Sequence, residues 1–177
     1  MRAALLALAC LAASASAQDA ATPGAAGAEA VVGAYVEAFA TGDFSTAAGA
    51  LDPVELGEFV GLLGLLSETD DAPFPVDTTA APVEAFAGFL EAIVGLAPEM
   101  GDAFDSLQAT VLGSVAEGDS LRHVVVRSEV RLFDATVSTV EATTARWTGT
   151  RWVVTFDAKM QQFRQMLEGA LAAEGDG

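Results

Sequence analysis

The apolar positions of this chain follow two different periods, one in each half. From Ala28 to about Gln108 they recur every three or four residues, as in an amphipathic helix, and one such stripe consists of Val32, Tyr35, Val36 and Phe39. After Gln108 they alternate with polar positions, which is typical of strands with one buried face. Helices followed by a run of strands predict an α+β fold, with the helices packed on one face of a curved antiparallel sheet.

Helix-start signals divide the first half. The tetrapeptide Asp52-Pro53-Val54-Glu55 combines an N-cap, a proline at the first helical position and a capping-box glutamate, so it predicts a helix to about Ser67. The same Pro-Val-Glu start recurs at Pro82 and predicts a helix to Leu96. Only the start is repeated, so we interpret it as shared capping chemistry and not as a duplication. Both helices are apolar on most of their surface, which is typical of helices that are buried on several sides or line an apolar cavity.

Shorter elements fill the rest of this half. Asp43 can N-cap a short helix through Leu51, and one further turn is expected over 101–107. Residues 68–81 are predicted to be a loop because they combine prolines with four acidic side chains: Glu68, Asp70, Asp71 and Asp77. Such carboxylates can surround Ca²⁺, but they lack the spacing and the central glycine of an EF-hand, so we interpret them as a solvated loop.

Turn signals divide the second half into four strands. The turns are Glu117-Gly118-Asp119, Asp134 and Thr148-Gly149-Thr150, and they separate segments 109–116, 121–133, 136–147 and 151–158. These segments predict a four-stranded antiparallel meander. A C-terminal amphipathic helix carrying Met160, Phe163, Leu167 and Ala170 is expected next, followed by a disordered tail over 172–177.

The N-terminal residues have the features of a signal peptide. Arg2 precedes an uncharged Ala/Leu run over 3–13, and Ala15-Ser16-Ala17 offers small residues where signal peptidase cleaves. We therefore expect a signal peptide over 1–17, a flexible linker over 18–27, one domain over 28–171 and a periplasmic or extracellular location. Lipid anchoring through Cys10 is the alternative. It is disfavoured because the usual leucine three positions upstream is missing.

The composition excludes several classes of function. Eight Lys and Arg residues against 25 Asp and Glu give a formal charge of -17, which repels nucleic acid and anionic lipid. One Cys and one His exclude zinc fingers, disulfide frameworks and multi-histidine metal sites. No Walker A, dinucleotide-binding, G-x-S-x-G or H-E-x-x-H motif occurs, and no cofactor or metal is expected.

Two segments resemble the NTF2-like (cystatin-like α+β) superfamily. They are the opening helix with its trailing Thr41-Gly42-Asp43, and the closing hairpin Trp147-Thr148-Gly149-Thr150-Arg151-Trp152. The resemblance covers about residues 29–158 and implies helices on a curved sheet that encloses a cone-shaped pocket. It also implies that dimers through the sheet are common. The chain departs from the usual pattern because helices replace the expected strand within 52–96, so the cone is expected to be covered or filled by the helices 53–67 and 82–96. Fold resemblance at this level carries no activity with it.

One strand carries the candidate catalytic side chains. Alternation on 121–133 places His123, Arg127, Glu129 and Arg131 on one face, with Val124, Val126, Val130 and Leu132 on the other. Glu141 on the next strand is expected to share the charged face. A histidine beside a carboxylate can act as a general base, and arginines can polarise a carbonyl. The sheet segments hold five arginines in this acidic chain: Arg122, Arg127, Arg131, Arg146 and Arg151.

Three functions fit these observations. The leading hypothesis is an exported binding domain without catalytic activity, holding a small apolar ligand or a protein partner, because catalytic motifs are missing and the helices are so apolar. The alternative is an isomerase- or lyase-type enzyme that uses His123 as base, which requires His123 and its arginines to face a concave pocket. In the simplest interpretation the alternating charges form a solvated face with cross-strand ion pairs. A purely structural role fits equally well.

Overall fold

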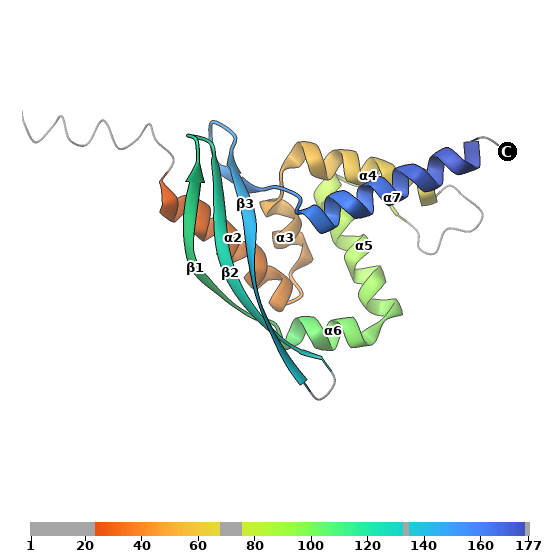
Figure 1. Cartoon of the computed structure of the whole chain (residues 1–177). Helices are drawn as coiled ribbons and strands as arrows, with labels where there is room; N and C mark the ends of the chain where they lie inside the picture. The colour runs from red at the N-terminus through yellow and green to blue at the C-terminus, as the bar shows by residue number, and fades with distance from the viewer. Residues whose placement is uncertain (1–23, 68–75, 133–134, 176–177) are drawn as a thin grey trace, which may run out of the picture.

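The computed structural model describes residues 24–67, 76–132 and 135–175, and every structural statement below concerns these residues. Within them the chain forms a four-stranded antiparallel sheet in the order β1-β2-β3-β4, with helices before and after it (Figure 1). The helices are α2 (Ala25–Ala40), α3 (Phe44–Ala50), α4 (Pro53–Ser67), α5 (Pro82–Leu96), α6 (Pro98–Asp105) and α7 (Ala158–Gly175). The strands are β1 (Gln108–Glu117), β2 (Leu121–Leu132), β3 (Ala135–Trp147) and β4 (Trp152–Val154).

The helices cover one face of the sheet. In Figure 1, α2 passes behind the strands, α3 lies next to it, and α4, α5 and α7 lie farther from the sheet on the same side. This confirms the expected α+β architecture, with the N-terminal helices on a meander and a helix at the C-terminus. None of the described helices has the length and apolar character needed to cross a membrane.

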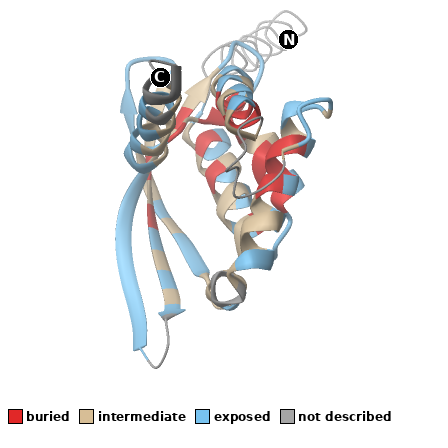
Figure 2. Cartoon of the chain, turned by 90° about the vertical axis from the view of Figure 1, so that its right-hand side faces the viewer, coloured by how far each residue is buried: buried red, intermediate tan, exposed pale blue. Residues whose placement is uncertain are grey.

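The burial pattern separates the two faces of the sheet. Val124 and Val126 of β2 are buried against the helices, as the alternation predicts, while Arg127, Glu129 and Arg131 are exposed. Phe59 is at the centre of the core and is fully buried. Figure 2 shows the buried residues concentrated in the helices, whereas much of β3 is exposed beyond them. The core is therefore mainly helical, and the end of β3 that begins at Ala135 projects from it.

The predicted helix starts are formed, with one difference. Asp52 Oδ1 accepts hydrogen bonds from the amides of Val54 (2.9 Å) and Glu55 (3.4 Å), and α4 runs over Pro53–Ser67 as expected. The second half of the predicted capping box is absent, because the Asp52 amide donates to the Val154 carbonyl. Glu55 instead accepts a hydrogen bond from the Phe156 amide at 2.7 Å. Both bonds connect the start of α4 to the chain at β4.

Several boundaries differ from the prediction. Helix α2 begins at Ala25, inside the expected linker over 18–27, and Gly27 packs so closely on β4 that a Cβ there would lie 2.8 Å from the Trp152 ring. Gly27 lets the helix pack closely against Trp152. The composition of 18–27 had instead suggested that its glycines make the segment flexible. Helix α6 begins at Pro98, three residues earlier than expected, because proline suits the first turn of a helix.

The ends of the expected last strand and last helix also change. Strand β4 stops at Val154, four residues before the predicted end. Helix α7 continues to Gly175, through most of the tail 172–177 that was predicted to be disordered. The expected signal peptide over 1–17, Cys10 and the Asp134 turn lie outside the described residues.

Candidate functional site

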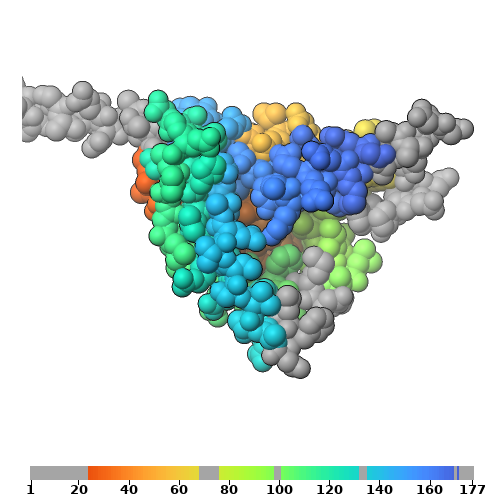
Figure 3. All heavy atoms as spheres, viewed as in Figure 1, coloured from red at the N-terminus to blue at the C-terminus, as the bar shows by residue number. Residues whose placement is uncertain are grey.

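The main candidate site is a cavity of about 250 Å³ between the helices and the end of the sheet. Most of its lining residues come from α2, α4, α5, β3, β4 and α7, and from the segment 155–157 between β4 and α7. Figure 3 shows a hollow below α7, between β3 and α5, with atoms of the N-terminal helices at its bottom. The lining thus combines both ends of the domain, and the two apolar helices α4 and α5 cover the space without filling it.

One side of the cavity is a cluster of phenylalanine rings. Phe59 of α4 lies at its centre, with ring centroids 5.7 Å from Phe86, 5.5 Å from Phe156 and 5.9 Å from Phe163. The contacts with Phe86 and Phe156 are edge-to-face, the arrangement that aromatic rings prefer. Leu90 and Ile93 of α5 extend this apolar wall. An apolar molecule would be in contact with ring faces and aliphatic side chains on this side.

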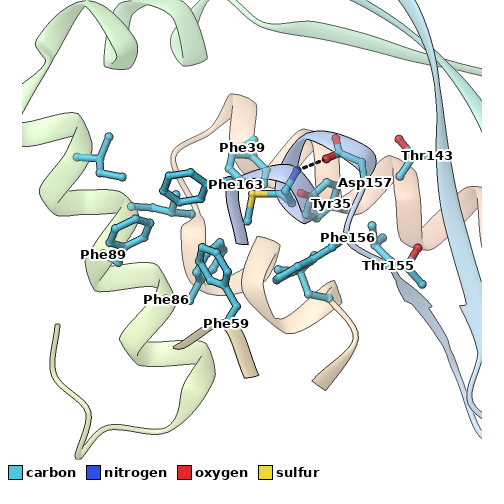
Figure 4. A pocket seen from close by; sticks show the side chains of 15 residues that line it. Tyr35, Phe39, Phe59, Phe86, Phe89, Thr143, Thr155, Phe156, Asp157 and Phe163 are labelled. Atoms are coloured by element: carbon cyan, nitrogen blue, oxygen red, sulfur yellow. Dashed lines mark hydrogen bonds between the residues drawn. The ribbon is translucent and has the colours of Figure 1, made fainter. Parts of the chain in front are cut away.

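The opposite side carries the polar atoms of the cavity. Figure 4 shows Tyr35, Thr143, Thr155 and Asp157 grouped on this side, across from Phe86 and Phe89. Thr155 Oγ1 donates to the Thr144 carbonyl at 3.2 Å. Asp157 precedes α7, and its Oδ1 accepts a hydrogen bond from the Met160 amide at 2.8 Å (Figure 4). The cavity is therefore apolar at one end and polar at the other.

Electrostatics at the polar end are set by one carboxylate. Burial raises the pKa of the Tyr35 hydroxyl well above its usual value, and the negative charge of Asp157 raises it further. The hydroxyl therefore stays protonated at every physiological pH and remains able to donate a hydrogen bond. Among the described residues that line the cavity, none is Lys, Arg or His.

The predicted general base lies away from this cavity. His123 Nε2 is 2.6 Å from Glu117 Oε2, and its Nδ1 is 3.1 Å from Thr144 Oγ1. Its side chain is 38% exposed and does not line the cavity. Period 2 predicted correctly that His123 lies on the face opposite Val124, and this is the face that the helices do not cover.

The other candidates on β2 are not brought together with His123. Glu129 and Arg131 border a separate hollow of about 320 Å³ near the end of the sheet, together with Ser106, Gln108 and Thr136. Glu129 lies six positions along the strand from His123, a distance of about 20 Å. Arg127 is exposed and lines neither space. The geometry that an enzyme using His123 requires is therefore not formed.

The expected position of Glu141 is wrong. Glu141 lies directly opposite Val126 in the β2–β3 register, so it shares the helix-covered face and not the face of His123. Its Oε1 accepts a hydrogen bond from Lys159 Nζ of α7 at 2.9 Å. The arginines are also divided: Arg122 lies opposite buried Ala145, and Arg146 pairs with Asp52. They do not form one cluster of donors.

Asp52 is the buried carboxylate that the sequence identified only as a helix cap. It is fully buried and receives the Arg146 guanidinium together with two backbone amides. Burial alone raises the pKa of this carboxyl. The hydrogen bonds from Arg146, Val54 and Glu55 outweigh burial, so the pKa lies below its usual range. Because both oxygens of this buried carboxylate accept from protein donors, Asp52 has a structural role.

The predicted acidic loop offers no metal centre in its described part. Asp77 caps its own turn, because its Oδ1 accepts from the Thr79 amide at 2.9 Å and from the Thr79 hydroxyl at 2.6 Å. Glu68, Asp70 and Asp71 lie outside the described residues. Elsewhere in residues 24–67, 76–132 and 135–175, no three His, Cys, Asp or Glu side chains are close enough to hold an ion.

The apolar wall of the cavity could be predicted from the sequence, and its polar end could not. The all-round apolar helices 53–67 and 82–96 predicted either burial or a cavity wall, and they do both. The polar end was missed because Tyr35 and Asp157 lie at opposite ends of the domain. One sequence signal could have indicated the role of Asp157 as a helix cap, because an aspartate before an amphipathic helix is a typical N-cap.

Comparisons with known proteins give a likeness in structure and none in sequence. No family model and no curated protein sequence matches the chain. Among solved structures, it is similar to the crystal structure of an NTF-2 like protein of unknown function from Shewanella oneidensis MR-1. The two are 17% identical, and the match covers 70% of this chain and 88% of that one with a TM-score of 0.42. With a TM-score this low the likeness carries no argument, and the site is interpreted from its own residues.

Proposed function

We propose that this protein is an exported binding protein that holds a small apolar molecule in the cavity between α4, α5 and α7 and does not transform it. The observation that carries the proposal is the aromatic cavity itself. Its volume of about 250 Å³ exceeds the ~150 Å³ of a dry apolar cavity that holds a benzene ring. The space therefore suits a molecule about the size of two fused rings.

The chemistry of the lining favours binding over catalysis. Its one carboxylate, Asp157, is an N-cap on α7, and its one phenol, Tyr35, is held protonated. A general acid or base works best with a pKa near the operating pH, and the raised pKa of Tyr35 is far from it. The β2 candidates for catalysis, among them His123 and Arg127, lie on the other face of the sheet. The lining can thus contact and orient a ligand.

Export is the second part of the proposal, and the N-terminal sequence supports it. N-terminal sequencing of protein recovered from the periplasm or medium of its host tests it directly. We expect the mature chain to begin at Gln18. Recovery of chains that still begin at Met1 from the cytoplasm would contradict this part and leave the binding proposal standing.

Binding is tested with 1-naphthalenemethanol, a neutral probe with two fused rings. We expect one molecule bound per chain by isothermal titration calorimetry. The substitution Leu90→Trp fills the apolar wall, so it should reduce binding at least tenfold. Val140→Trp is the matched control because Val140 is 57% exposed on the uncovered face of the sheet.

The two variants also separate loss of the site from loss of the fold. Both should keep the circular dichroism spectrum of the parent protein, and Val140→Trp should bind the probe as the parent does. Absence of probe binding by the parent protein, or undiminished binding by a folded Leu90→Trp variant, would overturn the proposal.

A further inference from the structure

We infer that the cavity selects molecules with a positive head group: an amphipathic amine whose apolar part lies among the phenylalanines and whose ammonium group lies beside Asp157. This inference rests on the proposed function and adds the chemical class of the ligand. The arrangement in Figure 4 places the rings at one end of the space and Asp157 with the two threonines at the other.

The first argument is the charge of the lining. Asp157 is the one ionised side chain among the described lining residues, and no basic side chain lines the space to offset it. Its effect extends into the cavity, since the Asp157 charge adds to the raised pKa of the buried Tyr35 hydroxyl. A carboxylate placed at this end would be repelled, whereas an ammonium group would be attracted.

The second argument concerns the nearby groups that can compensate Asp157. Lys159, two residues along α7, is 76% exposed, and its Nζ is 2.9 Å from Glu141 Oε1. Arg164 of the same helix pairs with Glu58 at 3.1 Å and with Glu168 at 3.6 Å. Each cation thus has a carboxylate partner of its own, and although the Asp157 charge also contributes to the raised pKa of Lys159, the contribution of Glu141 is larger. The net charge of -17 acts in the same direction as Asp157 over longer distances.

The start of α7 is the feature that opposes this inference. The first amides of a helix carry a partial positive charge equal to about half an elementary charge, which favours anions. Here Asp157 already occupies that position, because its Oδ1 accepts from the Met160 amide. A full negative charge on Asp157 exceeds the partial charge of the helix end, so the sum at the polar end stays negative.

The aromatic side adds a weaker preference in the same direction. The rings of Tyr35 and Phe39 also line the space, and their centroids are 5.1 Å apart in an edge-to-face pair. Ring faces attract cations at distances up to about 6 Å. An ammonium group near Asp157 would therefore lie close to a carboxylate and an aromatic ring. The Tyr35 hydroxyl oxygen could accept a hydrogen bond from it.

The test compares three probes with one skeleton and different charges. They are 1-naphthylmethylamine, which is protonated at neutral pH, 1-naphthalenemethanol, which is neutral, and 1-naphthoate, which is an anion. Calorimetric titration at low salt should give the amine about three- to tenfold tighter binding than the alcohol, and the anion weaker binding by a similar factor. The preference should decrease as salt is added, because the site is partly open to water.

Substitution of the carboxylate assigns the preference to Asp157. Asp157→Asn and Asp157→Ser remove the charge but keep an N-cap residue for α7, so both should fold. Each should weaken binding of the amine more than binding of the alcohol, so that the two affinities come to within about twofold of each other. Asp43→Asn is the matched control: Asp43 caps α3 through the Thr46 amide at 3.0 Å and does not line the cavity.

The outcomes distinguish this inference from the proposed function. If the alcohol binds but the amine binds no tighter, or the anion binds as well as the amine, the inference is wrong and the apolar site stands. If the preference persists in both Asp157 variants, it comes from the overall charge, and the assignment to Asp157 is overturned. If none of the three probes binds, the proposed function itself fails.

Discussion

Helices α4 and α5 begin with the same three residues and are attached to the domain in different ways. At the start of α4, Asp52 caps the helix and pairs with Arg146, while Glu55 accepts the Phe156 amide. At the start of α5, Ala81 provides no side-chain cap, and Glu84 is exposed with no ion pair among the described residues. The shared tripeptide Pro-Val-Glu sets where each helix starts, and the preceding residue and its partners decide how firmly it is held.

This difference bears on how a ligand reaches the cavity. Helix α4 is connected to β3 and to the segment after β4 by polar contacts, whereas α5 contributes Phe86, Leu90 and Ile93 through apolar packing. The first turn of α5 has no side-chain cap, and helix ends of this kind open locally at a low free energy. We therefore expect α5 to be the wall that moves when a ligand enters, and α4 to stay in place.

The largest effect is expected from breaking the attachment of α4. Asp52→Ala removes the helix cap and the partner of Arg146 and should lower the free energy of unfolding by about 2–4 kcal/mol. The cost stays below that of stranding a fully buried charge because the Arg146 side chain is 42% exposed and can be hydrated. Urea unfolding monitored by circular dichroism measures it, and a loss below that of an ordinary surface substitution would contradict this role for Asp52.

The charge of Asp52 can also be removed without mutation by lowering the pH. Because its pKa lies below the usual range in the folded protein, the unfolded chain binds the proton first. The stabilisation is therefore complete above the unfolded pKa of about 4 and is lost as the pH falls through the lower folded value. Urea unfolding between pH 6 and pH 3 should show a smaller loss for Asp52→Asn than for the parent protein. Equal acid sensitivity would assign the effect to other carboxyls.

A paired substitution tests the two glutamates directly. Glu55→Gln weakens a charge-assisted bond to the Phe156 amide and should cost about 1–2 kcal/mol. Glu84→Gln makes the same chemical change at an exposed position and should alter stability by less than about 0.5 kcal/mol. Thermal denaturation of both variants alongside the parent gives the comparison. Similar stability changes for the two variants would mean that the hydrogen bond between Glu55 and the Phe156 amide contributes little to stability.

The smallest expected effect comes from giving α5 the cap that it lacks. Ala81 already has the extended backbone of an N-cap residue, so Ala81→Asp should add about 1 kcal/mol to the free energy of unfolding. If α5 is the mobile wall, hydrogen exchange of its first-turn amides should slow, while exchange in α4 should not change. Slower exchange throughout both helices would indicate that they open together.

Local sequence signals predicted the helices and strands well. Features that depend on contacts between distant segments could not be predicted from them. The bounds 53–67 and 82–96 are those observed, because proline at the first helical position marks a start independently of the rest of the chain. The faces of β2 also followed from alternation. The face of Glu141 did not, because the register of β3 against β2 depends on the turn between them, and a one-residue shift reverses every side chain.

The site shows the same limit. Period 3.6 grouped Tyr35 with Phe39, and both line the cavity. No local sequence pattern indicates that Asp157 lies near Tyr35. None indicates that Glu55 accepts a hydrogen bond from the Phe156 amide instead of completing a capping box. On β2, alternation alone indicated which face carries the charged side chains, and that face is the one that the helices leave uncovered, as the solvated-face interpretation expects.

The contacts that hold α4 also bear on the order in which the domain folds. Asp52 meets Arg146, Glu55 meets Phe156 and Glu58 meets Arg164 across 94, 101 and 106 residues of chain, respectively. Closing loops of this length costs entropy before any contact repays it, and such contacts slow folding. During synthesis α4 and α5 are made early but must wait for the last third of the chain. The cavity is thus completed only when α7 arrives, and a ligand bound there would stabilise the finished domain alone.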